Sequence, residues 1–344
     1  MRLSQQAGEQ VSVSEPLVDG TLPDGSRVQL TFGSDIATRG SNFTIRKFAD
    51  IPFTPVDLIQ NGTFSVEQMA YFWLVIGHNR SLIFAGGTGS GKTTSMNAVS
   101  MFIPEDSKVV SIEDTREITL PHENWIQSLT RDSIASDGRG EVSMYELLQA
   151  SLRQRPEYIL VGEIRTEKNV AFTFFQSIGT GHTAYSTIHA ESVEGVLNRL
   201  ENKPLNVPTQ MILELDVICI QKQTFKGDDR VRRNDGVTEL LAGDDGGDSV
   251  RAIDIFDRDA NADSFHRVNN SHVLQDIADN RGWSGKELAQ QQRDRREFLQ
   301  YLVDNDISGY HEVTSGIHKF GKKQDELMAK VRDGTLTARD LLNE

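Results

Sequence analysis

The sequence predicts an α/β fold built on a mainly parallel β-sheet. Short apolar runs typical of buried strands alternate with helix-compatible segments through the middle of the 344-residue chain. In addition, 37% of the residues are hydrophobic, which is enough to form a core. Such alternation places helices on both faces of the sheet. The expected strands are Leu82–Ala85, Val109–Ile112, Tyr158–Val161 and Thr183–Ile188, and the expected helices follow Lys92 and cover Met144–Gln154 and Asn169–Ile178.

A small β-rich region is expected before this core. Gln10–Ser14 and Arg27–Phe32 are strand-like, and Pro23-Asp24-Gly25 between them has the composition of a hairpin turn. We interpret residues 1–49 as the C-terminal part of an N-terminal α+β domain. Residues 50–56 contain two prolines and are predicted to be an extended linker.

Helix signals flank the alternating region. Ser65 is expected to cap an apolar helix that runs through Ile76 and ends at Gly77. Strand signals stop near Phe265, and the later segments have the spacing of short amphipathic helices. These segments are Ser271–Arg281, Ser284–Asn305 and Lys322–Arg332, so the predicted domains are 1–49, the linker 50–56, a core at 57–265 and a C-terminal helical region at 266–344.

The composition restricts the class of partner. Fifty acidic and 36 basic residues give a net charge of −14, and arginine outnumbers lysine by 24 to 12. A surface this negative repels nucleic acid, so direct nucleic-acid binding is not expected unless a local basic channel exists. The acidic excess gathers in Gly243–Asp248 and Asp254–Asp263, which we expect to be solvated loops. An alternative is a surface adapted to high salt.

No targeting or membrane-spanning segment is predicted. The longest apolar run, Ala70–Ile76, is far shorter than a bilayer span, and the N-terminus lacks the pattern of a signal peptide. We therefore expect a cytoplasmic protein. The single cysteine, Cys219, lies in the apolar run Val217–Ile220 and is expected to be a buried core thiol.

A phosphate-binding loop is predicted directly after the first strand of the core. The segment Gly86–Thr93 fits the pattern G-x-x-x-x-G-K-[ST], with an apolar strand before it and a helix-compatible run after it. Glycines let backbone N–H groups turn around a phosphate, and the following helix directs its positive end at the same anion. Lys92 should bridge the β- and γ-phosphates of ATP, and the Thr93 hydroxyl should ligate Mg²⁺. The expected nucleotide-binding residues are Gly86, Gly87, Thr88, Gly89, Ser90, Gly91, Lys92, Thr93 and Thr94.

Reactive side chains follow the other predicted strands. Glu113 and Asp114 follow the second strand, Glu163 and Arg165 follow the third, and His189 follows the fourth. In open parallel sheets a ligand binds beyond the carboxyl ends of the strands, so these side chains should converge on the phosphates. An acid at such a strand end is suited to a second position in a Mg²⁺ site.

Four segments in this order resemble the motifs of one superfamily. The phosphate loop, Ile112–Ile118, Tyr158–Arg165 and Gly179–Ala190 resemble the Walker A, Asp box, Walker B and His box of the type II/type IV secretion ATPases. This resemblance implies a RecA-like P-loop NTPase core at 57–265. Leu22–Arg27 with Arg39–Arg46 resembles the archaeal branch, which powers type IV pili and the archaellum. The acidic, arginine-rich surface would suit a halophilic archaeon.

The resemblance also implies roles for single residues. Glu113 is the candidate general base that orients the attacking water, and Glu163 is the Walker B acid that acts on Mg²⁺ through water. His182 and His189 are candidate sensors of the γ-phosphate or of a subunit interface. Arginines ahead of the linker match positions at which the family's N-terminal domain presents arginine to the nucleotide; these are Arg27, Arg39 and Arg46.

The function implied is ATP hydrolysis by a hexameric motor. Such a motor would assemble or extract pilin-like subunits, or export protein, at the inner face of the cell membrane, bound there through a polytopic platform protein. Two alternatives remain open: a conjugation-type DNA or protein translocation ATPase, and a non-hydrolysing regulatory subunit that binds nucleotide. Family members usually have a longer N-terminal region, whereas Met1 here falls inside the domain before the linker. A fragment, a mis-started reading frame and a naturally short paralogue are all consistent with this.

Overall fold

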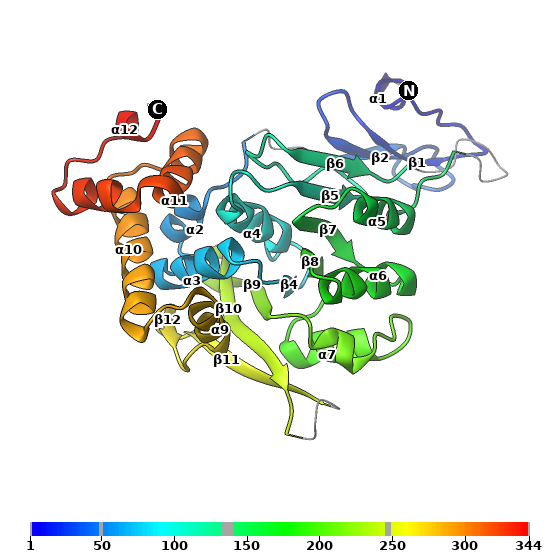
Figure 1. Cartoon of the computed structure of the whole chain (residues 1–344). Coiled ribbons are helices and arrows are strands. Elements are labelled where there is room, and N and C mark those ends of the chain that lie inside the picture. The colour runs from blue at the N-terminus through cyan, green and yellow to red at the C-terminus, as the bar shows by residue number, and fades with distance from the viewer. Residues whose placement is uncertain (1, 48–50, 132–139, 245–248, 343–344) are drawn as a thin grey trace. The chain divides into compact units, whose positions relative to one another are not determined.

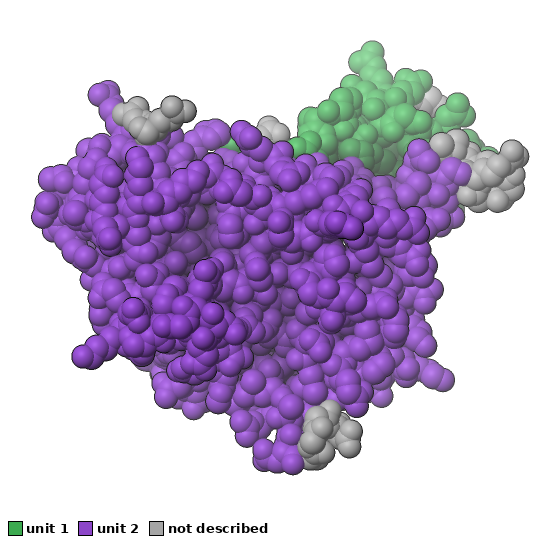
Figure 2. All heavy atoms as spheres, viewed as in Figure 1, with its two compact units in different colours: residues 1–51, 114–117 green, residues 52–113, 118–344 purple. Residues whose placement is uncertain are grey.

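The computed structural model describes residues 2–47, 51–131, 140–244 and 249–342 (Figure 1). The chain forms two compact units (Figure 2). Unit 1 contains residues 1–51 together with 114–117, and unit 2 contains residues 52–113 and 118–344. Helix α2, described below, begins at Pro55, so the last two residues of the predicted linker are helical.

Unit 1 is built on a three-stranded antiparallel sheet among its described residues, in the order β1-β2-β3. Val18 of the first strand is paired with Leu30 of the second, which is paired with Phe43 of the third, so these side chains share one face. Val18 and Leu30 are buried on that face, whereas Phe43 is exposed. The elements are α1 (Arg2–Gln6), β1 (Leu17–Thr21), β2 (Arg27–Thr31) and β3 (Asn42–Arg46).

The first strand predicted in this region is wrong. Gln10–Ser14 is irregular, and β1 begins only at Leu17. The reason lies in a local turn: Ser12 N–H donates to the Glu15 carbonyl at 3.1 Å, and Glu15 N–H donates to Ser12 Oγ at 3.1 Å. Such serine contacts satisfy the backbone locally and compete with strand pairing. The second predicted strand is confirmed as β2.

Unit 2 contains a nine-stranded sheet within the described residues, in the order β12-β11-β10-β9-β4-β8-β7-β5-β6. The strands from β9 to β6 run parallel, and β9 to β12 pair antiparallel. All four predicted core strands are present, and the predicted mainly parallel α/β class is confirmed. The strands are β4 (Leu82–Gly86), β5 (Val109–Glu113), β6 (Trp125–Leu129), β7 (Tyr158–Ile164), β8 (Thr183–Ile188), β9 (Val217–Lys226), β10 (Asp229–Ala242), β11 (Val250–Asp259) and β12 (Ser264–Arg267).

Helices cover both faces of this sheet, as the strand β4 illustrates. Leu82 and Phe84 pack into a core with helices α2, α3, α4 and α9 to α12, whereas Ile83 and Ala85 pack into a second core with α5 to α8. Successive strand residues point to opposite faces, so a fully apolar strand supplies both cores. The helices are α2 (Pro55–Gln60), α3 (Val66–Gly77), α4 (Lys92–Val99), α5 (Met144–Arg153), α6 (Lys168–Gly179), α7 (Val193–Glu201), α8 (Thr209–Ile212), α9 (His272–Arg281), α10 (Gly285–Asp304), α11 (Tyr310–Arg332) and α12 (Ala338–Leu342), with a 3₁₀ turn at Ser100–Phe102.

Serine caps begin several helices where the sequence predicts them. Ser65 and Ser284 each accept from the N–H three residues later and receive the reciprocal side-chain contact of a capping box. The last predicted helix was too short. Helix α11 begins at Tyr310 and contains a non-helical residue, Lys323, so the predicted segment Lys322–Arg332 is only its second half.

One of the two acidic loops expected from composition is not a solvated loop. Residues 254–259 lie in strand β11, and Asp263 is paired with Arg233 and Arg258. Strand β11 has an exposed face that carries charged residues, so its sequence lacks the continuous apolar run by which the other strands were predicted. Residues 245–248 of the other predicted loop, Gly243–Asp248, lie outside the described residues, as does Asp50 of the linker.

Two further expectations concern burial. Cys219 is fully buried, and burial raises the pKa of its thiol. This confirms a core thiol. Over the described parts of the chain, no helix has the length and apolar character needed to span a bilayer.

Candidate nucleotide site

The phosphate loop joins β4 to α4 in a shape that only glycine allows at its first position. Gly86 has φ 157°, and a Cβ placed on it would lie 2.2 Å from the Gln221 carbonyl oxygen and 2.5 Å from Ser90 Oγ. Ser90 Oγ in turn donates to the Gly87 carbonyl at 2.9 Å. The loop is therefore folded tightly on itself and against β9. Helix α4 begins within the last two residues of this segment, at Lys92, with Gly91 as the N-cap.

Lys92 lies inside this loop. Its side chain is buried, and Nζ donates to the carbonyls of Gly86 at 3.0 Å and Gly87 at 2.9 Å. His189 Nδ1 lies 3.4 Å from the same Nζ. The ammonium is thus held over the first two loop residues, which is where a phosphate anion would need a positive charge.

His189 lies between the lysine and an acid. Its Nε2 is 2.9 Å from Glu163 Oε1, a close contact that is not aligned as a hydrogen bond. Burial lowers the pKa of His189, the Lys92 charge lowers it further, and Glu163 opposes both. The neutral imidazole is therefore favoured. Because an ammonium can only donate, Nδ1 is the acceptor and Nε2 carries the proton toward Glu163.

Glu163 lies within β7 rather than beyond its end. The predicted strand stopped at Val161, but β7 continues to Ile164, and its pairing with β8 shifts register between these two residues. Such a bulge redirects a side chain at the end of a strand. The second carboxylate oxygen, Oε2, accepts from Arg165 Nε at 2.9 Å. Both oxygens of Glu163 are thus engaged by neighbouring side chains.

Glu113 ends the neighbouring strand β5 and is buried. Its Oε1 accepts from the Ile118 N–H at 2.9 Å, and Gln127 Nε2 lies 3.4 Å from Oε2. A Cβ on Gly162 would lie 3.4 Å from Glu113 Cγ. Glu113 therefore packs against the residue that precedes Glu163, and the two predicted acids lie on adjacent strands at the same edge of the sheet.

The remaining loop residues suit a magnesium nucleotide. Thr93 is half-buried and Thr94 is exposed at the start of α4. A hydroxyl and a carboxylate are hard oxygen ligands of the kind that Mg²⁺ prefers, and Mg²⁺ commonly keeps several waters. Within the described residues no three His, Cys, Asp or Glu side chains form a metal-binding group.

His182 is not part of this arrangement. It precedes β8, whereas His189 follows it, so about 20 Å of strand separates the two histidines. His182 Nδ1 lies 3.2 Å from the Ser177 carbonyl oxygen and 3.3 Å from Thr180 Oγ1, at the end of α6. The structure therefore does not bring His182 together with His189 and Lys92. A role for His182 as a sensor of the γ-phosphate or of a subunit interface stays a prediction.

The three predicted arginines all lie in unit 1. Arg27 Nη1 donates to Thr115 Oγ1 at 2.9 Å, and Arg46 Nη2 lies 2.7 Å from Glu117 Oε1. Arg39 is exposed in the turn before β3. Two of the three arginines thus hold the segment 114–117, which includes Asp114 and directly follows Glu113 in the chain.

Sequence reasoning missed two arginines near the loop. Arg199 of α7 donates to the carbonyl of His189 at 3.3 Å and to the carbonyl of Arg165 at 3.2 Å, and so joins the segments after β8 and β7. Arg232 of β10 donates through Nε to the Gly89 carbonyl at 3.0 Å. All three hydrogen bonds go to backbone oxygens of residues at least ten positions away, so no local pattern marks them.

The fold and this site define a P-loop protein of the mainly parallel α/β class. The family described as "Type II/IV secretion system protein" matches residues 4–304. Because this match covers most of the chain, the chain belongs to that family. The resemblance inferred from the four motifs is confirmed at this level.

Individual relatives come from archaea and bacteria. The uncharacterized protein MJ0900 of Methanocaldococcus jannaschii is 38% identical over 93% of this chain, which spans 58% of that relative's length. A second protein of that organism, MJ1287, is 44% identical over 72% of this chain and 91% of its own length. Among solved structures, the VirB11 ATPase of the Brucella suis type IV secretion system has a TM-score of 0.42 and 26% identity, covering 68% of this chain and 76% of that one.

Proposed function

We propose that the chain is the ATP-driven motor of a secretion or filament-assembly machine. The observation that carries this proposal is the joint placement of Lys92, His189 and Glu163 at the carboxyl ends of three adjacent strands, inside a family of secretion-system proteins. A loop lysine and a strand-end acid are the groups that P-loop enzymes use to position the phosphates and Mg²⁺ for hydrolysis.

ATP would be held by residues 86–94. Bound Mg²⁺–ATP supplies the phosphoanhydride bond, and the chain supplies charge and position around it. Lys92 would offer its ammonium to the β- and γ-phosphates, and Thr93 with Glu163 would hold Mg²⁺, Glu163 through water. Glu113, fixed by the Ile118 N–H, would orient the attacking water as general base.

The work coupled to hydrolysis is proposed from the family. We infer a homo-oligomer, with a hexamer as the expected form, that acts on the cytoplasmic side of the membrane through a polytopic platform protein. Pilin-like subunits would be moved indirectly, as in the archaeal pilus and archaellum branch. The net charge of −14 argues against DNA as the direct substrate.

Substitution of the loop lysine tests the proposal. Lys92→Ala should abolish ATP hydrolysis and weaken ATP binding, because it removes the charge that lies over Gly86 and Gly87. Lys286→Ala, which changes an exposed lysine of α10, is the matched control and should hydrolyse ATP at the wild-type rate. Normal ATP turnover by Lys92→Ala would refute the proposed role of the loop lysine. If the wild-type protein binds ATP but does not hydrolyse it, the chain would instead be a regulatory subunit.

A further inference from the structure

One side chain of strand β10 donates a hydrogen bond to the phosphate loop. Arg232 of β10 donates through Nε to the Gly89 carbonyl at 3.0 Å, and a Cβ on Gly91 would lie 3.2 Å from Arg232 Cδ. The arginine therefore lies along the middle of the loop. No motif places it there, and its strand was not predicted from the sequence.

The contact acts on a peptide that is intrinsically easy to reorient. Gly89 has φ 74°, and glycine adopts this and the opposite conformation at similar cost. In a trans peptide the carbonyl of one residue and the N–H of the next point in opposite directions. Arg232 holds the Gly89 carbonyl, and the Ser90 N–H donates to the Gly87 carbonyl at 3.4 Å. The orientation of the Gly89–Ser90 peptide is therefore held through both its carbonyl and its N–H group.

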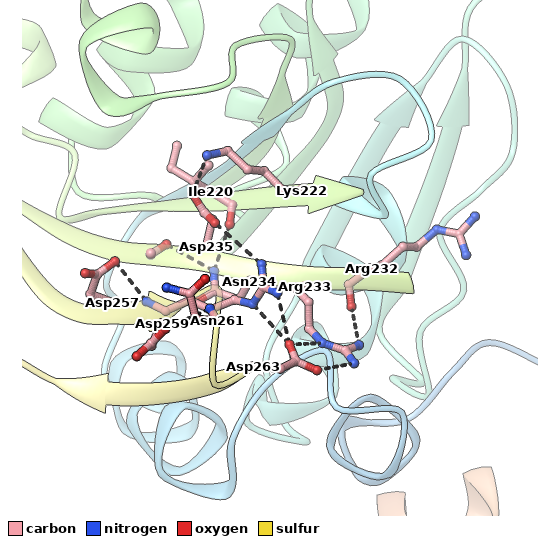
Figure 3. A network of polar contacts seen from close by, with 12 residues as sticks. Ile220, Lys222, Arg232, Arg233, Asn234, Asp235, Asp257, Asp259, Asn261 and Asp263 are labelled. Atoms are coloured by element: carbon pink, nitrogen blue, oxygen red, sulfur yellow. Dashed lines mark hydrogen bonds and ion pairs between the residues drawn. The ribbon is translucent and has the colours of Figure 1, made fainter. Parts of the chain in front are cut away.

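The strand that carries Arg232 is itself anchored by the next residue. Arg233 points away from Arg232, toward Asp263, as Figure 3 shows. Its side chain is buried, and its Nε and Nη2 each donate to one carboxylate oxygen of Asp263 at 2.9 Å. Its Nη1 also donates to the carbonyl of Asn61 at 3.1 Å and to that of Arg232 at 3.0 Å. The backbone at Arg232 is thus held directly by the neighbouring guanidinium.

Asp263 remains charged under ordinary conditions. It also accepts from Arg258 Nη2 at 3.0 Å, and the hydrogen bond from Arg233 holds the pKa of Asp263 far below its usual range. A two-point contact between a guanidinium and a carboxylate fixes orientation as well as distance. The pair Arg233–Asp263 is therefore a charged two-point contact, called the clamp below, that holds β10 at Arg233.

We propose that Arg232 is a positioning residue that keeps the phosphate loop in its nucleotide-binding shape, and that the clamp between Arg233 and Asp263 holds Arg232 in place. This inference rests on the proposed function, since it concerns the same ATP site. A loop fixed before binding loses less conformational freedom when phosphate arrives. This gain in binding free energy is equal for every nucleotide with a β-phosphate. It therefore changes the Kd and leaves the kcat of the bound complex nearly unchanged.

The decisive variant is Arg232→Met, which keeps the aliphatic stem and removes the donors. We expect the Kd for both ADP and ATP, measured by calorimetry with Mg²⁺, to rise about 10-fold, which is typical of losing one charged hydrogen bond. The kcat at saturating ATP should stay within about twofold of wild type. Because Arg232 is exposed, the Tm of the nucleotide-free variant should be close to that of wild type.

The matched control is Arg230→Met. Arg230 lies two residues earlier on the same strand and contacts the Phe225 ring, with its guanidinium carbon 5.8 Å from the ring centroid. This variant should bind nucleotide like wild type. Asp263→Asn should raise the Kd as Arg232→Met does, and the double variant should add little to either single effect. If Asp263→Asn does not fold, the result with Arg232→Met still decides.

Three results would overturn the inference: an unchanged Kd in Arg232→Met, a loss confined to kcat, or an equal loss in Arg230→Met. The proposed function fails separately. If wild type binds ATP and Lys92→Ala loses it while Arg232→Met binds normally, only the role of Arg232 is wrong. If wild type binds no nucleotide, both proposals are wrong.

Discussion

His189 Nε2 lies 2.9 Å from Glu163 Oε1, so the residue after β8 contacts the acid at the bulge of β7. The other ring nitrogen faces the ammonium of Lys92. A neutral imidazole thus joins the loop lysine to the acid proposed to act on Mg²⁺. Under the proposed function, this ring is the contact through which a change at the phosphate would reach Glu163.

The titration of His189 should reflect its two charged neighbours. Burial and Lys92 lower the pKa of His189, and Glu163 raises it. We expect its NMR titration midpoint below 6.5, with the neutral ring present at pH 7. Glu163→Gln should move the midpoint further down, and Lys92→Met should move it up. Shifts in the same direction in both variants would contradict the arrangement.

The two strand-end acids should separate binding from chemistry. Glu163→Gln should retain ATP but lose hydrolysis by about 10²-fold or more, because the acid is proposed to act on Mg²⁺ and not on the loop contacts. Glu113→Gln should behave alike, since its amide oxygen can still accept from the Ile118 N–H that Glu113 now binds. The ATP hydrolysis rate of each variant would be measured together with its Kd for ATP. If both variants hydrolyse ATP within a few-fold of wild type, neither acid is catalytic.

The arginines of unit 1 should matter for the assembled protein. We predict that the ATPase rate per subunit rises with protein concentration as a ring forms, and that Arg27→Ala, Arg39→Ala and Arg46→Ala lower the assembled rate by at least about 10-fold. The measurement pairs ATPase assays with sizing across the assembly range. A rate that is independent of concentration and unchanged in all three variants would argue against this mechanism.

Asp216 should make stability depend on pH. Burial raises the pKa of Asp216 to about 6, although Arg80 Nη1 lies 3.1 Å from its carboxylate and opposes the shift. Because the folded pKa exceeds the unfolded value, this group stabilises the fold at low pH and loses that contribution as pH rises toward 6. In urea unfolding, the free energy of unfolding of wild type relative to Asp216→Asn should therefore fall between about pH 4 and 6. An advantage that grows with pH would show that the Arg80 pair dominates.

The parts of the fold that the sequence predicts are those with a local signal. The parallel strands of unit 2 are continuous apolar runs because both faces are buried, and Ser65 carries its capping partner three residues away. Strands β9 to β12 carry no such signal over most of their length. Their charged residues, such as Lys222 and Asp235, pair across strands at 2.5 Å, a contact that only the folded sheet creates.

The same distinction applies to the site. The phosphate loop is contiguous, so its residue types predict its chemistry directly. Glu163 and His189 are found because each is close to the end of a strand. The contact of Arg232 with Gly89 joins positions 143 residues apart, and Arg199 binds two backbone carbonyls. Neither depends on a motif, so only the three-dimensional arrangement reveals them.

Residues 114–117 belong to unit 1, so unit 1 is joined to the rest of the chain at more than one point. The backbone passes between the units after Ile51 and again on both sides of this short segment. A module on a single proline linker could swivel without disturbing the rest of the chain. Here, tension on unit 1 reaches the peptide bond after Glu113 along the chain itself. A force on unit 1 would then displace Glu113, the residue proposed to orient the attacking water. The rate of hydrolysis would therefore depend on mechanical load.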